Sequence, residues 1–180
     1  MLIFIIGDTH RTQEINRLRN YSFRWEQTDA FLNAAVDASL ALAFMIAAAE
    51  ALGIGTCPIS KVRESSDAIA KLLKLPRGAF PVCACAFGYP QKENQSISPR
   101  LPQSVVVHRD TYQPIDFSEI DQYDETFNRV AGSPKARYPE KFGEPQQTTW
   151  SDNLARQTAV LERPDFREMC ERQGLFRKQS

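Results

Sequence analysis

A long apolar segment between Phe31 and Leu52 constrains this chain more than any other part of its sequence. After Asp37 the apolar residues occupy every side of the predicted helix, and many of them are alanines. Thr28 or Asp29 can cap its start, because both side chains accept hydrogen bonds from backbone N–H groups. A helix that is apolar all round must be buried all round, and alanines let another helix approach closely. The segment therefore predicts either the centre of the core or a helix–helix seam between two copies.

A glycine loop and a short Pro-Ile-Ser turn follow this helix, within the segment Ala48–Arg63. We expect Gly53 and Gly55 to let the chain leave the helix through left-handed backbone angles, which residues with a Cβ avoid. The chain could then run close beneath a flat cofactor ring and offer backbone N–H groups to it. The simpler interpretation is a helix C-cap followed by a buried strand, and the pattern alone leaves both open.

Two apolar runs predict strands. Leu2–Ile6 is continuously apolar and precedes Gly7-Asp8, which is typical of a buried central strand with its exit turn. Val82–Phe87 is a second uninterrupted run. Strands with helices between them indicate a mixed α/β layer. Because folded domains seldom begin inside a central strand, we expect further residues to precede Met1, on this chain or on a partner.

The remaining segments predict short elements. Residues 8–26 are expected to form a surface loop or a short irregular helix, Ser65 or Ser66 to cap a short helix, and Val105–Val107 to be extended. From Tyr112 onward charges become more frequent and three helical patterns appear. Their expected bounds are Asp116 with Glu119 to about Val130, Ser151 to about Leu161, and Pro164 to Gly174. Such short helices must pack on their own core or on a second subunit.

Composition excludes several classes of function. With 180 residues and 42% hydrophobic residues, the chain suits one domain or a compact body with an extension. Lys+Arg and Asp+Glu are equal at 22 each, so no net charge attracts nucleic acid or an acidic membrane. The four cysteines lack metal-binding spacing and indicate buried thiols in a reducing compartment. The charge-free run Ala38–Ala49 is shorter than the roughly 18 residues of a membrane span. We therefore expect a cytoplasmic protein without a metal, nucleic-acid or membrane partner.

Arg100 lies in a segment stiffened by prolines, Ser98-Pro99-Arg100-Leu101-Pro102. A pre-ordered guanidinium suits bidentate phosphate binding, because less entropy is lost on contact. The alternative is a solvated loop arginine. Lys61 and Arg63 could add positive charge near an anionic group, or serve as surface caps.

Several segments in order resemble the flavin-dependent nitroreductase family, in particular its oxygen-insensitive NADPH nitroreductases and NADPH–flavin oxidoreductases. These segments are AAEALGIGTCPIS, LLKLP, FPVCACAFGYP, SPRLPQSVVVHRDTYQPID, TTWSDNLARQ, RPDF and RQG. The resemblance implies an α+β fold, a sandwich of helices around a mostly antiparallel sheet with a helical C-terminal arm. It also implies a partial core at residues 1–111 and an extension at residues 112–180 that packs on the core or on a dimer partner.

The resemblance implies FMN as the cofactor, bound at the interface of a homodimer. By position, the family's flavin-stacking turn falls on four residues whose backbone amides would meet the ring's reactive edge: Pro58, Ile59, Ser60 and Lys61. The phosphate-binding pair falls on Ser98 and Arg100. The family usually has lysine or arginine at the first position of this pair, so we expect Ser98 to have lost one ionic contact.

The implied reaction is ping-pong hydride transfer from NADPH through FMN to a small-molecule acceptor, such as a nitroaromatic, a quinone or a flavin. Arg129 and Arg137 are candidates for selecting NADPH. Family members begin with a helix carrying an Arg-Ser-x-Arg-type motif that grips FMN, and we expect this N-terminal region to be missing. The alternative function is therefore a non-catalytic, truncated remnant, or a subunit that needs a partner to complete the flavin site. Flavin dehalogenases and a flavin-fragmenting enzyme share the fold, but the WSD and RPDF segments favour the nitroreductases.

Overall fold

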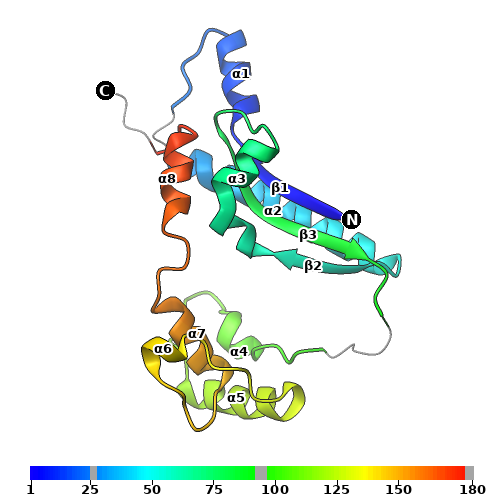
Figure 1. Cartoon of the computed structure of the whole chain (residues 1–180), viewed down its shortest axis with the longest axis vertical. Helices are drawn as coiled ribbons and strands as arrows, with labels where there is room; N and C mark the ends of the chain where they lie inside the picture. The colour runs from blue at the N-terminus through cyan, green and yellow to red at the C-terminus, as the bar shows by residue number, and fades with distance from the viewer. Residues whose placement is uncertain (25–27, 92–96, 177–180) are drawn as a thin grey trace. The chain divides into compact units, whose positions relative to one another are not determined.

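The computed structural model describes residues 1–24, 28–91 and 97–176, which divide into two compact units (Figure 1). The first unit comprises Met1–Gln91 together with Arg163–Ser180, and the second comprises Lys92–Glu162. The expected core at 1–111 and extension at 112–180 stay a prediction.

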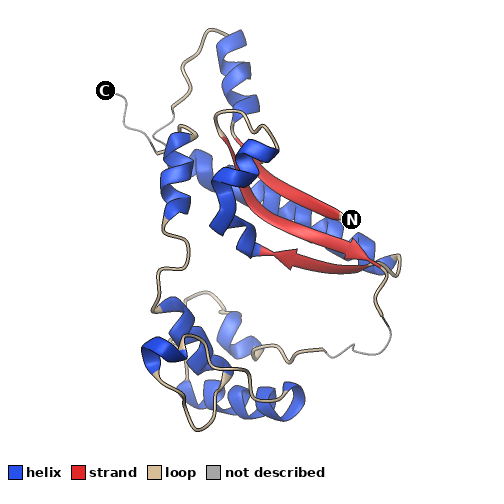
Figure 2. Ribbon diagram, viewed as in Figure 1, coloured by secondary structure: helices blue, strands red, loops and turns tan. Residues whose placement is uncertain are grey.

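A three-stranded antiparallel sheet forms the centre of the first unit, in the order β1-β3-β2 (Figure 2). Its strands are β1 (Leu2–Asp8), β2 (Gly55–Ile59) and β3 (Ala79–Gly88). The expected antiparallel sheet and both apolar strands are confirmed. The central position expected for β1 is wrong in the described sheet, where β1 lies at an edge and β3 lies between the other two. A continuous apolar run shows that a strand is covered, but it does not show how many neighbours the strand has.

Helices make up most of the rest of the first unit. They are α1 (His10–Leu18), α2 (Thr28–Ala51), the 3₁₀ helix η1 (Ser60–Ser65), α3 (Ser66–Leu72) and α8 (Asp165–Arg172). Of these, α2, α3 and η1 contact the sheet, α2 packs against all three strands, and α8 contacts α3 and η1. The long apolar helix, the helix expected near Ser65 and the last helix are confirmed, and residues 8–26 contain the short helix α1.

Aromatic rings join three distant parts of the first unit. Phe80 of β3 is almost completely buried with Met169, Cys170 and Leu175. Its ring stacks on Phe31 of α2 with centroids 4.7 Å apart. Burial of this kind contributes about 1.5–3 kcal/mol per large side chain. The core therefore depends on residues from β3, α2 and the C-terminal segment.

Gly78, directly before β3, joins the residues at the start of α1 to the segment after α8. Its carbonyl accepts hydrogen bonds from the backbone N–H and the hydroxyl of Thr9, both at 2.9 Å. Its own N–H donates to the carbonyl of Gln173 at 2.8 Å. The backbone of Gly78 has φ +91°, and an added Cβ would lie 2.1 Å from Nε2 of Gln13. Glycine is therefore required here by both backbone angle and space.

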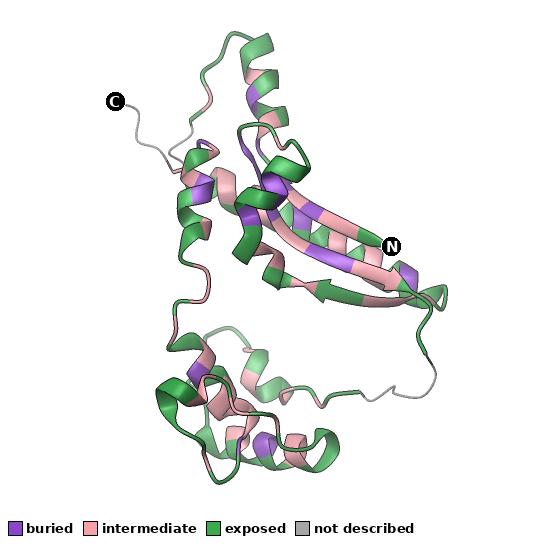
Figure 3. Ribbon diagram, in the orientation of Figure 1, coloured by how far each residue is buried: buried purple, intermediate pink, exposed green. Residues whose placement is uncertain are grey.

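Much of α2 is left uncovered within one copy of the chain (Figure 3). Only Ala38 and Ala49 are buried among its residues, so the expected burial on all sides is not observed. Four large apolar side chains are 45–74% exposed at a spacing of four residues: Leu32, Val36, Leu40 and Phe44. By length and composition α2 could also cross a membrane, but core helices of soluble proteins pass the same test. The expectation of a cytoplasmic protein stays a prediction.

The second unit is helical in its described residues. It contains α4 (Gln103–Val106), α5 (Phe117–Ala131), α6 (Pro139–Phe142) and α7 (Trp150–Thr158), and α5 packs on α7. The expectation that Val105–Val107 is extended is wrong for Val105 and Val106, which lie in α4. Pro102 precedes this helix, and prolines are well tolerated at helix starts.

The two expected helix caps of this unit have different outcomes. Asp116 caps α5, as predicted, by accepting a hydrogen bond from the N–H of Ser118 at 2.9 Å. The predicted cap of α7 by Ser151 is wrong, because Thr149 caps this helix instead. The hydroxyl and N–H of Ser151 both bind the carboxylate of Asp124 on α5, which local sequence could not reveal.

We predict that Gly78→Ala lowers the free energy of unfolding by about 3 kcal/mol, because left-handed strain is added to a steric clash. Gly53→Ala is the matched control, since Gly53 also has positive φ but an added Cβ would have no neighbour within 4 Å. It should cost only about 1–2 kcal/mol. Urea unfolding followed by circular dichroism measures both values. Equal losses would contradict the steric part of the argument.

Candidate functional site

The glycine loop after α2 combines a helix cap with the start of a strand. The N–H of Ile54 donates to the carbonyl of Ala49 at 2.9 Å, and Gly53 has φ +74°. This is the geometry of a Schellman C-cap, so the expectation for Gly53 is confirmed. The expectation for Gly55 is wrong, because Gly55 is part of β2 and pairs with Gly88. There an added Cβ would lie 3.3 Å from the Gly88 carbonyl oxygen. A C-cap followed by a strand is therefore present, and this geometry leaves a cofactor role open.

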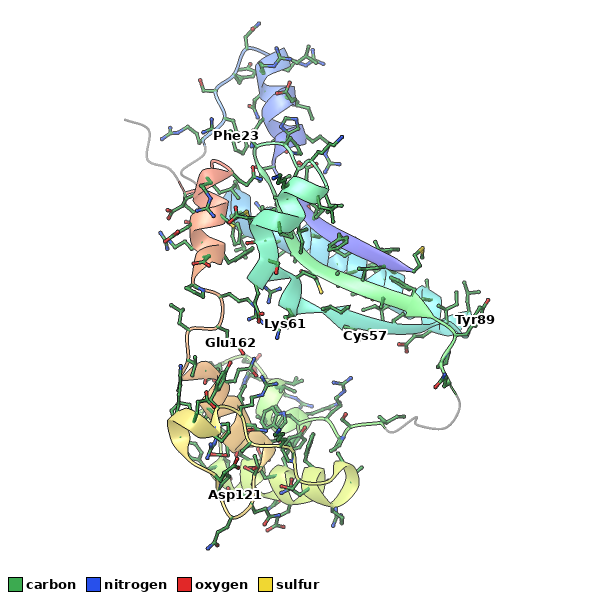
Figure 4. All side chains as sticks on the ribbon, in the orientation of Figure 1. Phe23, Cys57, Lys61, Tyr89, Asp121 and Glu162 are labelled. Carbon is green, nitrogen blue, oxygen red and sulfur yellow. The ribbon has the colours of Figure 1, made fainter. Side chains whose placement is uncertain are left out.

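The predicted flavin turn lies where β2 passes directly into η1. Pro58 and Ile59 end the strand, and Ser60 and Lys61 begin η1. Figure 4 labels Cys57, directly before this turn, and Lys61, its last residue. Pro58, Ser60 and Lys61 are exposed, and Ile59 is half-buried. Ile59 occupies the N-cap position of η1, and its apolar side chain cannot accept a hydrogen bond from the first N–H groups of that helix. The turn thus presents uncovered apolar surface beside the N–H groups at a helix start, which together suit a flat polar ring.

Two arginines support this turn from within the first unit. Nη2 of Arg163 donates to the Ser60 hydroxyl at 3.5 Å, so the segment before α8 reaches the turn. Nη1 of Arg63 donates to the carbonyl of Val82 at 2.6 Å, which ties η1 to β3. Sequence reasoning did not place Arg163 at the site, although its RPDF motif was one of the resembling segments. Arg63 therefore has a structural contact in addition to its charge.

Ser98 and Arg100 belong to the second unit, and both are exposed. Arg100 borders a cavity of about 330 Å³ whose other lining residues are Pro99, Leu101, Val106, Tyr123 and Trp150. The Tyr123 hydroxyl donates to the Pro99 carbonyl at 3.0 Å, and Tyr123 packs edge-on against Trp150. These contacts hold the backbone beside Arg100, in keeping with the stiffness expected from the prolines. A joint site with the turn of the first unit stays a prediction.

The two candidates for NADPH selection have different surroundings. Arg129 borders a cavity that is also lined by Asp121, Asp124 and Glu125, which repel a phosphate. Arg137 borders a cavity of about 230 Å³ without a carboxylate, whose other lining residues are Phe127, Pro134, Trp150, Asn153, Leu154 and Gln157. The charges that line the two cavities therefore favour Arg137 over Arg129 as an anion-binding residue, although Arg137 also lies 3.9 Å from the Glu162 carboxylate.

The thiols of this chain differ strongly in accessibility. Cys57, one residue before the turn, is exposed, and Cys83 is half-buried. Burial raises the pKa of the Cys85 thiol, and it raises the pKa of the Cys170 thiol to about 12. Within residues 1–24, 28–91 and 97–176, no group of three or more His, Cys, Asp or Glu residues could hold a metal ion.

Comparison with known proteins identifies the family. A model described as "Nitroreductase family" matches residues 1–89, and one described as "Nitroreductase family, C-terminal domain" matches residues 98–178. The structure of the hypothetical oxidoreductase YcnD from Bacillus subtilis has a TM-score of 0.84 and 31% identity, over 99% of this chain and 70% of that one. This chain belongs to the nitroreductase family. The expected fold class is confirmed with it.

Other members of the nitroreductase family are similar over much of the chain. FMN reductase [NAD(P)H] of Bacillus subtilis is 37% identical over 161 residues, which are 86% of this chain and 61% of that protein. Oxygen-insensitive NADPH nitroreductase of Salmonella typhimurium is 33% identical over 129 residues, which are 72% of this chain and 50% of that protein. The structure of B. megaterium NfrA2 has a TM-score of 0.85 at 28% identity, over 98% of this chain and 70% of that one. This nitroreductase chain thus spans about half to three fifths of the length of these two curated relatives.

We predict that Cys57 alone reacts rapidly with an aromatic disulfide reagent in the folded nitroreductase chain. At pH 8 a pKa of about 12 leaves Cys170 with about a thousandfold less thiolate than an ordinary thiol of pKa 9.0. Cys57→Ser should remove the fast phase of absorbance change, and the control Cys83→Ser should retain it. Fast modification of Cys170 before unfolding would contradict the burial described here.

Proposed function

We propose that this chain is an FMN-dependent NAD(P)H oxidoreductase that reduces small acceptors such as nitroaromatics, quinones or flavins. The observation that carries the proposal is the exposed turn Pro58–Lys61, which has a supported backbone and apolar surface in a chain of the nitroreductase family. The names of its relatives, FMN reductase and oxygen-insensitive NADPH nitroreductase, point to the same cofactor and electron donor.

The residues present fit a flavin ring at this turn. Pro58 and Ile59 would supply the apolar surface for the ring, and the first N–H groups of η1 would donate to its polar edge. The Lys61 ammonium lies 3.6 Å from the Glu64 carboxylate, and its side chain is 78% exposed, so it can turn toward an anion. Arg163 would hold Ser60 in place through its hydrogen bond.

Arg100 would bind the FMN phosphate. Its exposed guanidinium can form two parallel charge-assisted hydrogen bonds, and its neighbouring backbone is anchored through Tyr123. Ser98 can add one neutral hydrogen bond from its hydroxyl, where lysine or arginine would add a charge.

The chemistry of the reaction belongs to the flavin, which accepts hydride from NAD(P)H and passes it to an acceptor. The chain itself would orient the ring, bind the nucleotide and exclude water from the face opposite the acceptor. No side-chain acid or base is required, which agrees with an exposed turn that carries only Ser60 and Lys61 as polar side chains. One surface used in turn by donor and acceptor would give ping-pong kinetics.

A homodimer would cover the uncovered side of α2. The stripe Leu32, Val36, Leu40 and Phe44 follows one helical row, and alanines beside it permit close approach of a second helix. An exposed apolar stripe of this length is unusual on a monomer in water. A second copy of the chain is therefore the partner that we propose for it.

Titration with FMN, followed by anaerobic NADPH oxidation, tests the proposed function. The protein should acquire a shifted flavin absorbance, and NADPH should bleach it before a nitroaromatic restores it. Steady-state rates should give parallel double-reciprocal lines. A chain that does not bind FMN would instead support the alternative, a non-catalytic protein or a subunit that needs a partner.

We predict that Arg100→Ala weakens FMN binding about ten- to a hundredfold, because one charge-assisted contact of about 1.5–3 kcal/mol is lost. The matched control is Arg109→Ala, since Arg109 is an exposed arginine of the same unit and its loss changes the net charge equally. Fluorescence quenching of FMN measures both dissociation constants. Equal weakening by the two variants would indicate a general effect of charge and contradict the assignment of Arg100.

We also predict that Phe44→Glu converts the dimer to a monomer, because a carboxylate would be buried without a partner in the seam. Leu18→Glu is the matched control, since Leu18 of α1 is 73% exposed, Phe44 is 74% exposed, and Leu18 lies outside the stripe on α2. Analytical ultracentrifugation should show the wild-type mass and the Leu18→Glu mass at two chains. A wild-type protein that stays monomeric at micromolar concentration would contradict the seam.

A further inference from the structure

The side-chain amide of Asn153 binds the loop that carries Arg137 at two backbone positions. Its Nδ2 donates to the carbonyl of Lys135 at 2.8 Å, and its Oδ1 accepts from the N–H of Arg137 at 2.8 Å. The amide thus pairs with residues i and i+2, as a neighbouring strand would. The asparagine side chain carries its donor and its acceptor on two separate atoms, so it can bind both backbone groups at once. The contact therefore fixes the backbone of three residues at once.

A second side chain of α7 holds the other polar group of Arg137. Nη1 of Arg156 donates to the Arg137 carbonyl at 3.4 Å and to the Gly143 carbonyl at 2.9 Å. Arg156 is buried, and its Nε is paired with Asp152 at 2.7 Å. Side chains of α7 therefore bind both the backbone N–H and the backbone C=O of Arg137.

The guanidinium of Arg137 is oriented as well. It lies 3.9 Å from the Glu162 carboxylate, which also accepts from the Tyr138 hydroxyl at 3.2 Å and from Gln157 at 2.9 Å. Tyr138 has φ +50°, an angle that bulky residues adopt only where the surroundings enforce it. The Arg137 side chain is still 49% exposed. Its remaining donors are thus available to an anion from solvent.

The cavity beside Arg137 has the character of a site for a planar ring. Trp150, Phe127 and Pro134 supply flat apolar walls, and Gln157 and Asn153 supply polar groups. Its volume of about 230 Å³ is below the range of about 300–1,000 Å³ that suits drug-sized ligands, so it would take one ring system. A nucleotide base joined through its sugar to a phosphate matches this arrangement, because the base can lie between the aromatic walls while the arginine binds the phosphate.

We propose that Asn153 is a positioning residue for a phosphorylated dinucleotide: it holds Arg137 so that the guanidinium meets the 2′-phosphate while the adenine enters the adjacent cavity. This inference rests on the proposed function, in which NADPH is the electron donor. Asn153 acts through Arg137 and does not itself bind the phosphate. It sets the preference for a 2′-phosphorylated donor over an unphosphorylated one.

Isothermal titration of the full chain with 2′,5′-ADP and with 5′-AMP tests the inference without flavin. The wild-type protein should bind 2′,5′-ADP at least about tenfold more tightly than 5′-AMP, as one charge-assisted pair allows. Asn153→Ala should reduce this ratio about fivefold or more, and Asn16→Ala should preserve it. Asn16 is the matched control because it also donates from its side chain to a backbone carbonyl, that of Thr12.

A double-mutant cycle separates positioning from general stability. Arg137→Ala should abolish the preference for 2′,5′-ADP, and the double variant Asn153→Ala with Arg137→Ala should bind no more weakly than Arg137→Ala alone. Additive losses, or equal weakening of both ligands, would overturn the inference, as would a wild-type protein without the preference. If Asn153→Ala does not fold by circular dichroism, Asn153→Asp replaces it in the cycle. It loses the donor to Lys135, sets a competing charge beside Arg137, and should likewise reduce the ratio.

The two proposals can fail separately. A protein that does not bind FMN but prefers 2′,5′-ADP would contradict the proposed function alone. A yellow protein with equal affinity for both adenosine phosphates would contradict the role of Asn153 alone.

Discussion

The first unit depends on a close approach between the ring of Phe80 and the backbone of Gly7. These residues are paired across β1 and β3, and a Cβ on Gly7 would lie 2.4 Å from Cζ of Phe80. The absence of a side chain lets the ring lie over the strand and reach Phe31 of α2. Phe31 in turn lies 4.9 Å from Phe176, between ring centroids. One glycine thus permits the contact that joins sheet, long helix and C-terminal segment, and this core positions the turn after β2.

In the second unit, polar side chains of α7 add directional contacts to the aromatic packing of Tyr123 on Trp150. Ser151 binds Asp124 of α5, Asn153 binds the loop before α6, and Arg156 binds the carbonyls of Arg137 and Gly143. Hydrogen bonds depend on direction more strongly than apolar contacts do. A unit built on them can hold a loop in one conformation at the surface, which is what a binding site for a charged ligand needs.

Local patterns in the sequence predicted elements whose cause is local. The helix over the long apolar segment, the Asp116 cap and the glycine exit at Gly53 each depend on residues close to one another in the chain, and all three were predicted correctly. Two of the errors arise where a distant residue decides. Ser151 does not cap α7 because Asp124, 27 residues earlier, binds it. β1 lies at an edge because strand order depends on pairing between segments that are far apart in the chain.

The same distinction applies to the candidate site. Pro58–Lys61, Ser98 and Arg100 came from motifs that are contiguous in the sequence, so resemblance could locate them. The residues that hold candidate residues in place were not found in this way: Arg163 reaches Ser60 across 103 positions, and Asn153 reaches Arg137, the candidate for NADPH selection, across 16. A side chain that acts only by holding another residue's backbone has no fixed spacing from it. The fold determines which residue such a side chain binds. Its role can therefore be recognised only once the hydrogen bonds of the folded chain are known. This is why sequence resemblance offers candidates for the groups that would touch a ligand, which stay a prediction, and does not reveal the side chains that hold those groups in place.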